Sequence, residues 1–210
     1  MKCKLFMAIA IAALFSNLAV AGIDEGIEYR LVSPAQPTIT KNKVEVVELF
    51  WFGCPHCYHF EPDLKKWLAN KPENVVFVQI PAVFNAGWAL HARAYYTAKS
   101  LGLYDNGKHD FHDAFFEELH KHKKRLNTKK SLQAFFARFG VSAEDFNNTF
   151  DSFAVNTKVK RAAILSKRYQ LDGVPSLIVN GKYRVDGPMA GGRQGMLKVT
   201  DHLIKKESNK

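Results

Sequence analysis

Residues 48–58 have the sequence ELFWFGCPHCY, and this stretch decides the fold. Its first half ends a run of β-branched and aromatic residues that starts at Val44 and is typical of a buried central strand. Its second half opens a helical pattern, and Pro55 is well suited to the first turn of a helix. The sequence therefore predicts a buried strand followed directly by a helix, with Cys54 and Cys57 in the first helical turn.

Secondary-structure signals on either side of this stretch complete a β-α-β pattern. Phe60, Leu64 and Trp67 recur at helical spacing, and a second β-rich run covers residues 75–80. Upstream, residues 27–31 alternate between apolar and polar side chains, which predicts a half-buried strand. The resulting order of strand, strand, helix and strand is typical of an α/β fold.

The middle of the chain follows a different pattern. Residues 86–168 show helical periodicity without a strong strand signal, and their many phenylalanines recur at helical spacing. An aromatic helical core explains this spacing better than a ligand-binding face does. Strand signals return over 174–179 and 182–185, where an Asn-Gly pair between the two runs predicts a tight hairpin. A final helix is expected over residues 193–206.

These patterns together predict an α/β domain that is interrupted by an all-helical domain. We expect the first part of the α/β domain in residues 22–84, the helical insertion in 85–160 and the second part in 161–210. The chain shows no internal repeat and no low-complexity linker.

The first 21 residues have the features of a secretory signal peptide. Lys2 and Lys4 precede a short apolar run, and residues 19–21, Ala-Val-Ala, fit the small-x-small pattern of a cleavage site. The apolar run is too short to span a bilayer comfortably, so an uncleaved anchor is the weaker alternative. Cleavage would release a mature chain that starts at about Gly22, and we expect this chain to be exported to the periplasm.

The chain is strongly basic, with 30 lysines and arginines against 20 aspartates and glutamates. Removing Lys2 and Lys4 with the signal peptide lowers the net charge from +10 to +8. A basic surface can bind nucleic acid, anionic membranes or acidic partners, and export argues against nucleic acid. Much of the excess lies in residues 120–125, HKHKKR, which we interpret as a solvated loop or helix end. A docking surface for an acidic partner is the alternative.

The cysteines indicate a reactive site and not a structural disulfide. The chain has three, and Cys3 would leave with the signal peptide. The remaining pair would close too small a loop to gain much stability as a disulfide staple. A zinc site is an alternative, but a single Cys-x-x-Cys supplies two ligands where structural zinc needs four. His56, His59 and His91 could be recruited, although the ligand count makes this the weaker interpretation, and we expect no metal.

A Cys-x-x-Cys that follows a strand and opens a helix is the pattern of a redox-active pair. Cys54 would lie at the positive end of the helix, where unpaired amides favour thiolate over thiol and should lower its pKa. His56 can add a hydrogen bond or positive charge, and Pro55 sets the turn. We therefore expect Cys54 to be the nucleophile and Cys57 its buried partner. A stabilised thiolate makes the disulfide easier to reduce and the protein a stronger oxidant.

The stretch 48–58 closely resembles the DsbA family of bacterial disulfide-bond-forming proteins, and the likeness covers nearly the whole mature chain. The resemblance implies a thioredoxin-like fold with an inserted helical domain. It also implies that Pro175 is the cis-proline facing the active-site pair, and that Val174, just before it, contacts the bound peptide. A hydrophobic groove for unfolded peptides is expected beside the site. Plausible lining residues are Phe84, Trp88, Met189 and Ala190.

Glu48 is marked both by the sequence and by the resemblance. It is a charged residue inside a nearly unbroken apolar strand, so burial should raise its pKa. The resemblance makes it the buried acid beneath the site, able to relay a proton from Cys57. A strand-edge carboxylate facing solvent is the alternative. Members of the family often carry a lysine near this glutamate, whereas Gln79 stands at that position here, which puts any charge pairing of Glu48 in doubt.

These inferences combine into one expected function. The chain is predicted to be a periplasmic thiol:disulfide oxidoreductase that donates a disulfide to newly exported, reduced proteins through Cys54 and Cys57. That disulfide would be its redox group, without another cofactor. The resemblance implies a monomer that a membrane partner of the DsbB type reoxidises. The alternatives are a disulfide isomerase or reductase on the same fold, and a non-catalytic peptide-binding chaperone.

Overall fold

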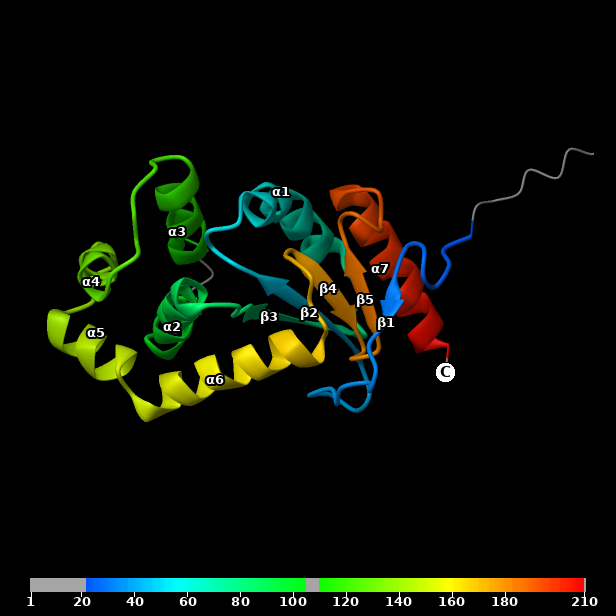
Figure 1. Cartoon of the computed structure of the whole chain (residues 1–210), viewed down its shortest axis with the longest axis horizontal. Coiled ribbons are helices and arrows are strands. Elements are labelled where there is room, and N and C mark those ends of the chain that lie inside the picture. Colours follow the sequence, from blue (N-terminus) through cyan, green and yellow to red (C-terminus); the bar gives the residue numbers. More distant parts are fainter. Residues whose placement is uncertain (1–21, 105–109, 210) are drawn as a thin grey trace, which may run out of the picture.

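The structure is a computed structural model that describes residues 22–104 and 110–209; the predicted signal peptide lies outside the described residues. Five strands form one mixed sheet in the order β1-β5-β4-β2-β3 (Figure 1). The parallel neighbours are β2 and β3, and the other adjacent strands are antiparallel. The strands are β1 (Arg30–Leu31), β2 (Val44–Phe50), β3 (Val75–Pro81), β4 (Ser176–Val179) and β5 (Tyr183–Asp186).

Helices cover both faces of this sheet (Figure 1). On one face, α1 (Pro55–Asn70) and α7 (Arg193–Ser208) pack on each other and on a cluster that includes Val46 of β2. On the other face, Val47 packs with Leu165 of α6 (Phe153–Arg168). Because β2 alternates its side chains between two buried faces, every one of its residues is buried, including its two glutamates, as its mainly apolar sequence predicts.

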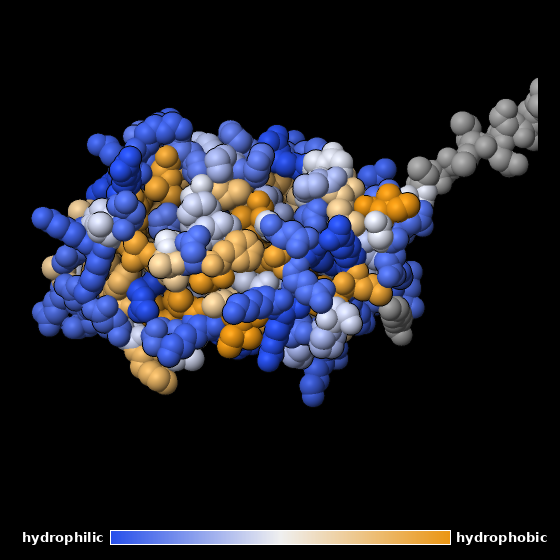
Figure 2. Space-filling model, viewed as in Figure 1, coloured by the Kyte–Doolittle hydropathy of each residue, from blue (hydrophilic) through white to orange (hydrophobic). Residues whose placement is uncertain are grey.

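All described strands lie outside the segment between β3 and β4, which forms five helices. Phe111, Phe115 and Phe136 are almost completely buried in a cluster that continues to Phe50 and Phe52, so the aromatic-core interpretation is right. Hydrophilic side chains cover most of the outer edge at this end of the molecule (Figure 2). The other four helices are α2 (Ala86–Ser100), α3 (Asp110–His120), α4 (Lys129–Ala137) and α5 (Ala143–Phe150).

Two sequence predictions about local structure are wrong. The strand expected over residues 27–31 is only Arg30–Leu31, because a turn with Gly26 at φ +84° precedes it. Its alternation fails as well, since Tyr29 is buried while Ile27 is 63% exposed. Phe153, expected among the core phenylalanines, is 84% exposed at the start of α6, where a helical turn begins with no neighbour over it.

The predicted hairpin has the expected turn. Asn180 and Gly181 have φ values of +52° and +67°, the pair of left-handed residues that a type I′ hairpin requires. The final helix runs to Ser208, two residues beyond the expected end. Within the described residues, no helix combines the length and apolar character needed to cross a membrane. The limits of the two domains stay a prediction.

Candidate active site

Cys54 is the N-cap residue of α1, so its sulfur lies where the helix has unpaired N–H groups. The backbone N–H of Cys57 donates to the Cys54 Sγ at 3.4 Å. A turn just before the helix sets this position, because the N–H of Cys54 donates to the carbonyl of Trp51 at 2.9 Å. Pro55 follows in the first helical turn, where its missing N–H costs no hydrogen bond. The sequence thus forms the N-cap with a thiol in place of the usual hydroxyl or carboxyl.

The surroundings of Cys54 favour its charged form. A hydrogen bond from the Cys57 thiol is the largest cause that lowers the pKa of Cys54, from 9.0 to about 6. The backbone N–H groups of Cys57 and His56 and the charge of His56 act in the same direction, against the opposing effect of burial. Both cysteines are free thiols here, so the structure represents the reduced protein.

Cys57 lies three residues further on but has no exposed surface. Burial is the main cause that raises the pKa of its thiol well above 9.0, and the negative charge of Cys54 adds to it. The buried sulfur is therefore a thiol when the outer sulfur is a thiolate. A neutral thiol is also the form that can donate a hydrogen bond to Cys54.

The loop before β4 brings the predicted cis-proline next to the outer cysteine. The Val174–Pro175 bond is cis, and the Cys54 thiol lies 3.3 Å from the carbonyl oxygen of Val174. Beside them is a largely apolar cavity of about 510 Å³ that includes His56, Val174, Pro175 and Met189 in its lining. The structure therefore brings the predicted cysteines, His56 and the proline loop together, and their roles in substrate binding stay predictions.

Glu48 lies on the face of β2 that carries Val46 and faces α1, and it is completely buried. Burial is the largest cause that raises its pKa well above 4.5, and the nearby charge of Glu61 raises it further. Gln79, its partner in the β2–β3 register, donates to one carboxyl oxygen at 2.8 Å. The other oxygen has no hydrogen-bond partner among the described residues. The solvent-facing interpretation is wrong, and an amide occupies the place of a charged partner.

A buried polar chain beside Glu48 was not predicted from the sequence. His112 Nε2 lies 3.0 Å from Oε1 of Glu61, and the hydroxyl of Tyr104 lies 3.2 Å from His112 Nδ1. Glu61 and His112 are 7% and 4% exposed. One signal was available, because Glu61 is four residues after Cys57 and so shares its buried helix face. His112 of α3 and Tyr104, in the turn after α2, had no comparable local signal.

The four residues expected to line a peptide-binding groove lie in different parts of the structure. Met189 lines the cavity beside the cis-proline, whereas Ala190 packs against the core beneath α7. Trp88 instead stacks on Trp51, with ring centroids 4.3 Å apart, and Phe84 also contacts the Trp88 ring, with centroids 4.7 Å apart. A Cβ on Gly53 would come within 2.3 Å of the Trp51 ring, so the glycine next to Cys54 leaves the room that this indole needs.

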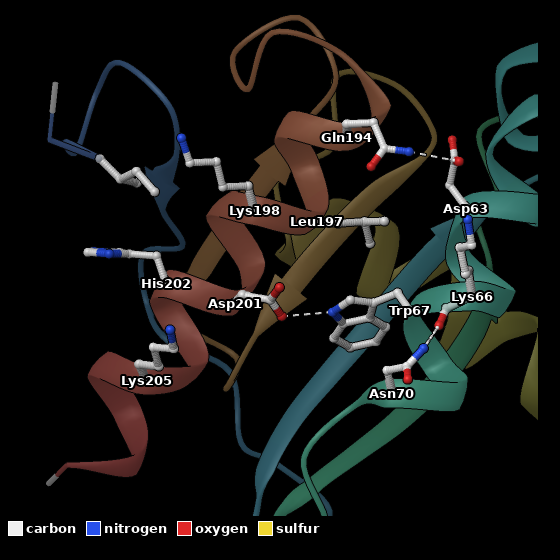
Figure 3. A pocket seen from close by; sticks show the side chains of 11 residues that line it. Asp63, Lys66, Trp67, Asn70, Gln194, Leu197, Lys198, Asp201, His202 and Lys205 are labelled. Carbon is white, nitrogen blue, oxygen red and sulfur yellow. Dashed lines mark hydrogen bonds between the residues drawn. The ribbon is translucent and has the colours of Figure 1, made fainter. Parts of the chain in front are cut away.

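A second large cavity, of about 640 Å³, lies between α1 and α7 and contains neither cysteine (Figure 3). Its floor includes Trp67, whose indole N–H donates to Asp201 at 2.7 Å, and lysines stand along its rim. Within the described part of the chain, no group of three side chains has the composition and proximity of a metal site. The redox pair is thus the centre with an evident chemistry.

Comparisons with known proteins agree with this geometry. The model of the DSBA-like thioredoxin domain matches residues 45–203. The chain is 44% identical over 202 residues to the thiol:disulfide interchange protein DsbA of Pseudomonas syringae pv. tomato, covering 95% of this chain and 92% of that protein. The protein of the same name from Pseudomonas aeruginosa is 43% identical, covering 95% and 93%.

Solved structures show the same likeness in three dimensions. The crystal structure of Pseudomonas aeruginosa DsbA superposes with a TM-score of 0.81 at 43% identity and covers 88% of this chain and 94% of that one. The oxidoreductase DsbA from Xylella fastidiosa gives a TM-score of 0.79 at 32% identity, covering 87% and 96%. The predicted α/β class with a thioredoxin-like fold is therefore confirmed.

Proposed function

The chain belongs to the DSBA-like thioredoxin family and is a thiol:disulfide oxidoreductase, and we propose that it works as a dithiol oxidase on newly exported proteins. The observation that carries the direction of transfer is the lowered pKa of Cys54, to about 6, at the N-terminus of α1. A stabilised thiolate stabilises the reduced protein, so the oxidised protein tends to accept electrons. The disulfide between Cys54 and Cys57 is the only redox group that the proposal needs.

The first step of the proposed reaction is attack on the Cys54 sulfur of the oxidised protein. A substrate thiolate forms a mixed disulfide with Cys54, the bond between the two cysteines breaks, and the electron pair leaves on Cys57. The buried Cys57 then takes up a proton, since burial opposes its charge. Glu48 is suited to hold that proton, because its own raised pKa keeps it protonated where an exposed carboxyl would be ionised.

The second step releases the oxidised substrate. The second thiolate of the substrate attacks the substrate sulfur of the mixed disulfide. The bond to Cys54 breaks, and Cys54 leaves as a thiolate. A leaving thiol of low pKa departs faster, so the donors at the N-terminus of α1 assist this step. Two electrons pass from the substrate dithiol to the protein, whose disulfide becomes a dithiol.

Val174 and Pro175 are proposed to hold the substrate next to the sulfur. The Val174 carbonyl already lies 3.3 Å from Cys54, so a peptide strand along this loop would reach the reacting atom. The neighbouring apolar cavity of about 510 Å³ fits side chains of an unfolded chain better than a charged small molecule. This supports unfolded, reduced proteins as substrates.

The test is oxidation of a reduced, unfolded protein by the purified oxidised protein. We expect stoichiometric loss of substrate thiols, with none in the Cys54→Ser variant. Faster repair of scrambled disulfides than dithiol oxidation would support an isomerase instead. Peptide protection that survives Cys54→Ala, without thiol oxidation by the unmodified protein, would support a chaperone.

The cellular setting belongs to the same proposal. We expect the signal peptide to be cleaved after residue 21, the mature protein to act in the periplasm as a monomer, and a membrane protein of the DsbB type to reoxidise it. Terminal sequencing of the exported protein would check the cleavage. Accumulation of its reduced form in cells that lack the reoxidase would check the partner.

A further inference from the structure

A basic loop follows α3 and is left unused by the proposed reaction. We define it as residues 121–125, Lys-His-Lys-Lys-Arg, and all five are exposed. Lys121 forms an exposed ion pair with Glu117 at 3.6 Å, which contributes little at the surface. Among the described residues, Lys123, Lys124 and Arg125 have no acidic partner. The loop therefore presents several uncompensated positive charges to solvent.

The backbone of the basic loop is held in a defined conformation. The N–H groups of His122 and Lys124 donate back to the carbonyls of Glu117 and Glu118, both at 2.9 Å. At the far end Leu126 is 5% exposed in the aromatic core, and its carbonyl accepts a hydrogen bond from His91 Nε2 at 3.1 Å. These bonds fix the backbone of the loop relative to the rest of the molecule, so its charged side chains extend from a defined place on the surface.

That position is beside the redox pair. His120, directly before the basic loop, donates from Nε2 to the carbonyl of Phe52 at 2.7 Å. Its ring stacks on Tyr58 with centroids 5.0 Å apart. Phe52 precedes Cys54 by two residues, so their Cα atoms lie within about 8 Å of each other. The end of α3 and the start of α1 lie at the same edge of the molecule, where the surface over the loop is hydrophilic (Figures 1 and 2).

We propose that the basic loop is a docking surface for acidic segments of substrate polypeptides, and this rests on the proposed dithiol oxidase function. Charges near a reactive centre raise the local concentration of oppositely charged partners and their association rate. The effect falls off over about one screening length, roughly 8 Å at physiological ionic strength, so it acts on polypeptide segments that pass close to the loop.

An anionic membrane would also attract this loop, but the geometry favours a polypeptide. The loop adjoins the segment that carries the outer sulfur, because His120 bonds to Phe52 two residues before Cys54, so a bilayer resting on the loop would hinder substrate access to that sulfur. A peptide strand can instead touch the loop with an acidic residue while its cysteine reaches the sulfur. The substrate class inferred is a cysteine-containing chain with acidic residues near the cysteine.

The test compares two reduced peptides that each carry two cysteines, one flanked by glutamates and the other by glutamines. The measured quantity is the second-order rate of their oxidation by the oxidised protein at low and high salt. We expect the glutamate peptide to react about tenfold faster at low salt. High salt should remove most of that difference because it screens exposed charges.

A pair of matched variants locates the effect. K121Q/K123Q/K124Q removes three charges from the basic loop, and K66Q/K198Q/K205Q removes three from the rim of the cavity between α1 and α7 (Figure 3). We expect the first variant to lose the preference for the glutamate peptide and the second to keep it. Both should oxidise the glutamine peptide at the normal rate.

The outcomes separate this inference from the function on which it rests. Failure of the unmodified protein to oxidise the glutamine peptide would contradict the proposed function itself. Normal oxidation of that peptide with no glutamate preference, or an equal loss in both variants, would overturn the docking surface alone. A loop variant that loses binding to vesicles of anionic phospholipid but keeps the peptide preference would also overturn it.

Discussion

The two ends of the redox pair lie in one helical turn but in opposite electrostatic surroundings. Cys54, at the tip of α1, receives hydrogen bonds from the Cys57 N–H and thiol, and its pKa falls to about 6. Cys57, turned towards the sheet, is fully buried near Glu48, and its pKa rises. One turn of helix is therefore enough to place one sulfur among donors and the other in the core, which decides which sulfur carries the charge.

The opposite pKa shifts on the two sides of this turn also determine how the stability of the reduced protein changes with pH. The folded pKa of Cys54 lies below its unfolded value, so the reduced protein gains stability as pH rises from about 6 towards 9 and loses it as pH falls through 6. Glu48 acts in the opposite sense, because its folded pKa is raised. Its favourable state is the protonated one, and stability is lost as pH rises above 4.5 towards that raised value.

The largest expected effect separates the roles of the two sulfurs. Cys54→Ser should reduce dithiol oxidation by more than about 10³-fold, because no sulfur remains for the substrate to attack. Cys57→Ser cannot form the internal disulfide either, but a mixed disulfide on its Cys54 has no internal thiol to reverse it. When each variant is given a disulfide-bonded polypeptide, the Cys54 thiolate of Cys57→Ser attacks that disulfide and one substrate thiolate leaves, so the mixed disulfide should accumulate on Cys57→Ser and not on Cys54→Ser, as non-reducing electrophoresis would show. Equal trapping by both variants would contradict the assignment.

The next largest effect tests the surroundings of the buried sulfur, through the carboxyl of Glu48. Glu48→Gln should raise the free energy of unfolding at pH 8 by about 1–3 kcal/mol, because folding no longer has to protonate or desolvate a carboxyl that is ionised in the unfolded chain. The gain should shrink as pH falls towards 4.5, where Glu48 is protonated in both the folded and the unfolded chain. Urea unfolding at several pH values measures this. A variant that is less stable than the unmodified protein at pH 8 would show that the carboxylate is stabilised in the fold.

A smaller effect tests how the two sulfurs are coupled. Cys57→Ala removes the largest cause of the lowered Cys54 pKa and should raise that pKa by about one unit. Cys57→Ser keeps a donor at the same place and is the matched control, with a pKa close to that of the unmodified protein. Thiolate absorbance against pH gives both values. Identical titrations of the two variants would mean that the helix amides alone stabilise the thiolate.

The smallest expected effect concerns His56, whose side chain is exposed. His56→Ala should raise the pKa of Cys54 by less than one unit, roughly a few tenths, since the backbone N–H of residue 56 stays in place and exposed charges are screened. The reaction of the Cys54 thiolate with an alkylating reagent across pH would detect the shift. A rise as large as that in Cys57→Ala would make the imidazole, and not the helix, the main stabiliser of the thiolate.

The sequence predicted those parts of the site that depend on neighbours along the chain. The strand, the cap position and the first helical turn follow one another over residues 48–58, so their local signals suffice to place Cys54 and Cys57. Glu48 was recognisable because a charge interrupts an apolar strand. Its amide neighbour Gln79 was found through the resemblance, and the parallel register of β2 and β3 places the two side by side.

Features that depend on distant packing were missed or misplaced. Glu61 of α1 contacts His112 of α3, which contacts Tyr104 in the turn after α2, and no spacing along the sequence predicts that these three residues meet. The stacking of Trp51 on Trp88 likewise needs the turn after β2 to lie next to α2. The strand expected over residues 27–31 failed because alternation alone cannot show which side of an edge segment has a neighbour to pack against.

The most direct test of the central claim is the thiolate absorbance of the reduced protein as a function of pH, with Cys54→Ser as the control. We predict one transition near pH 6 that disappears in the control, because Cys54 is the sulfur that the α1 N-terminus and the Cys57 thiol stabilise. A transition near the ordinary cysteine value of about 8.5 would contradict the account. The physical basis for a strong oxidant would then be lost, and a reductase or a peptide-binding role would explain the fold better.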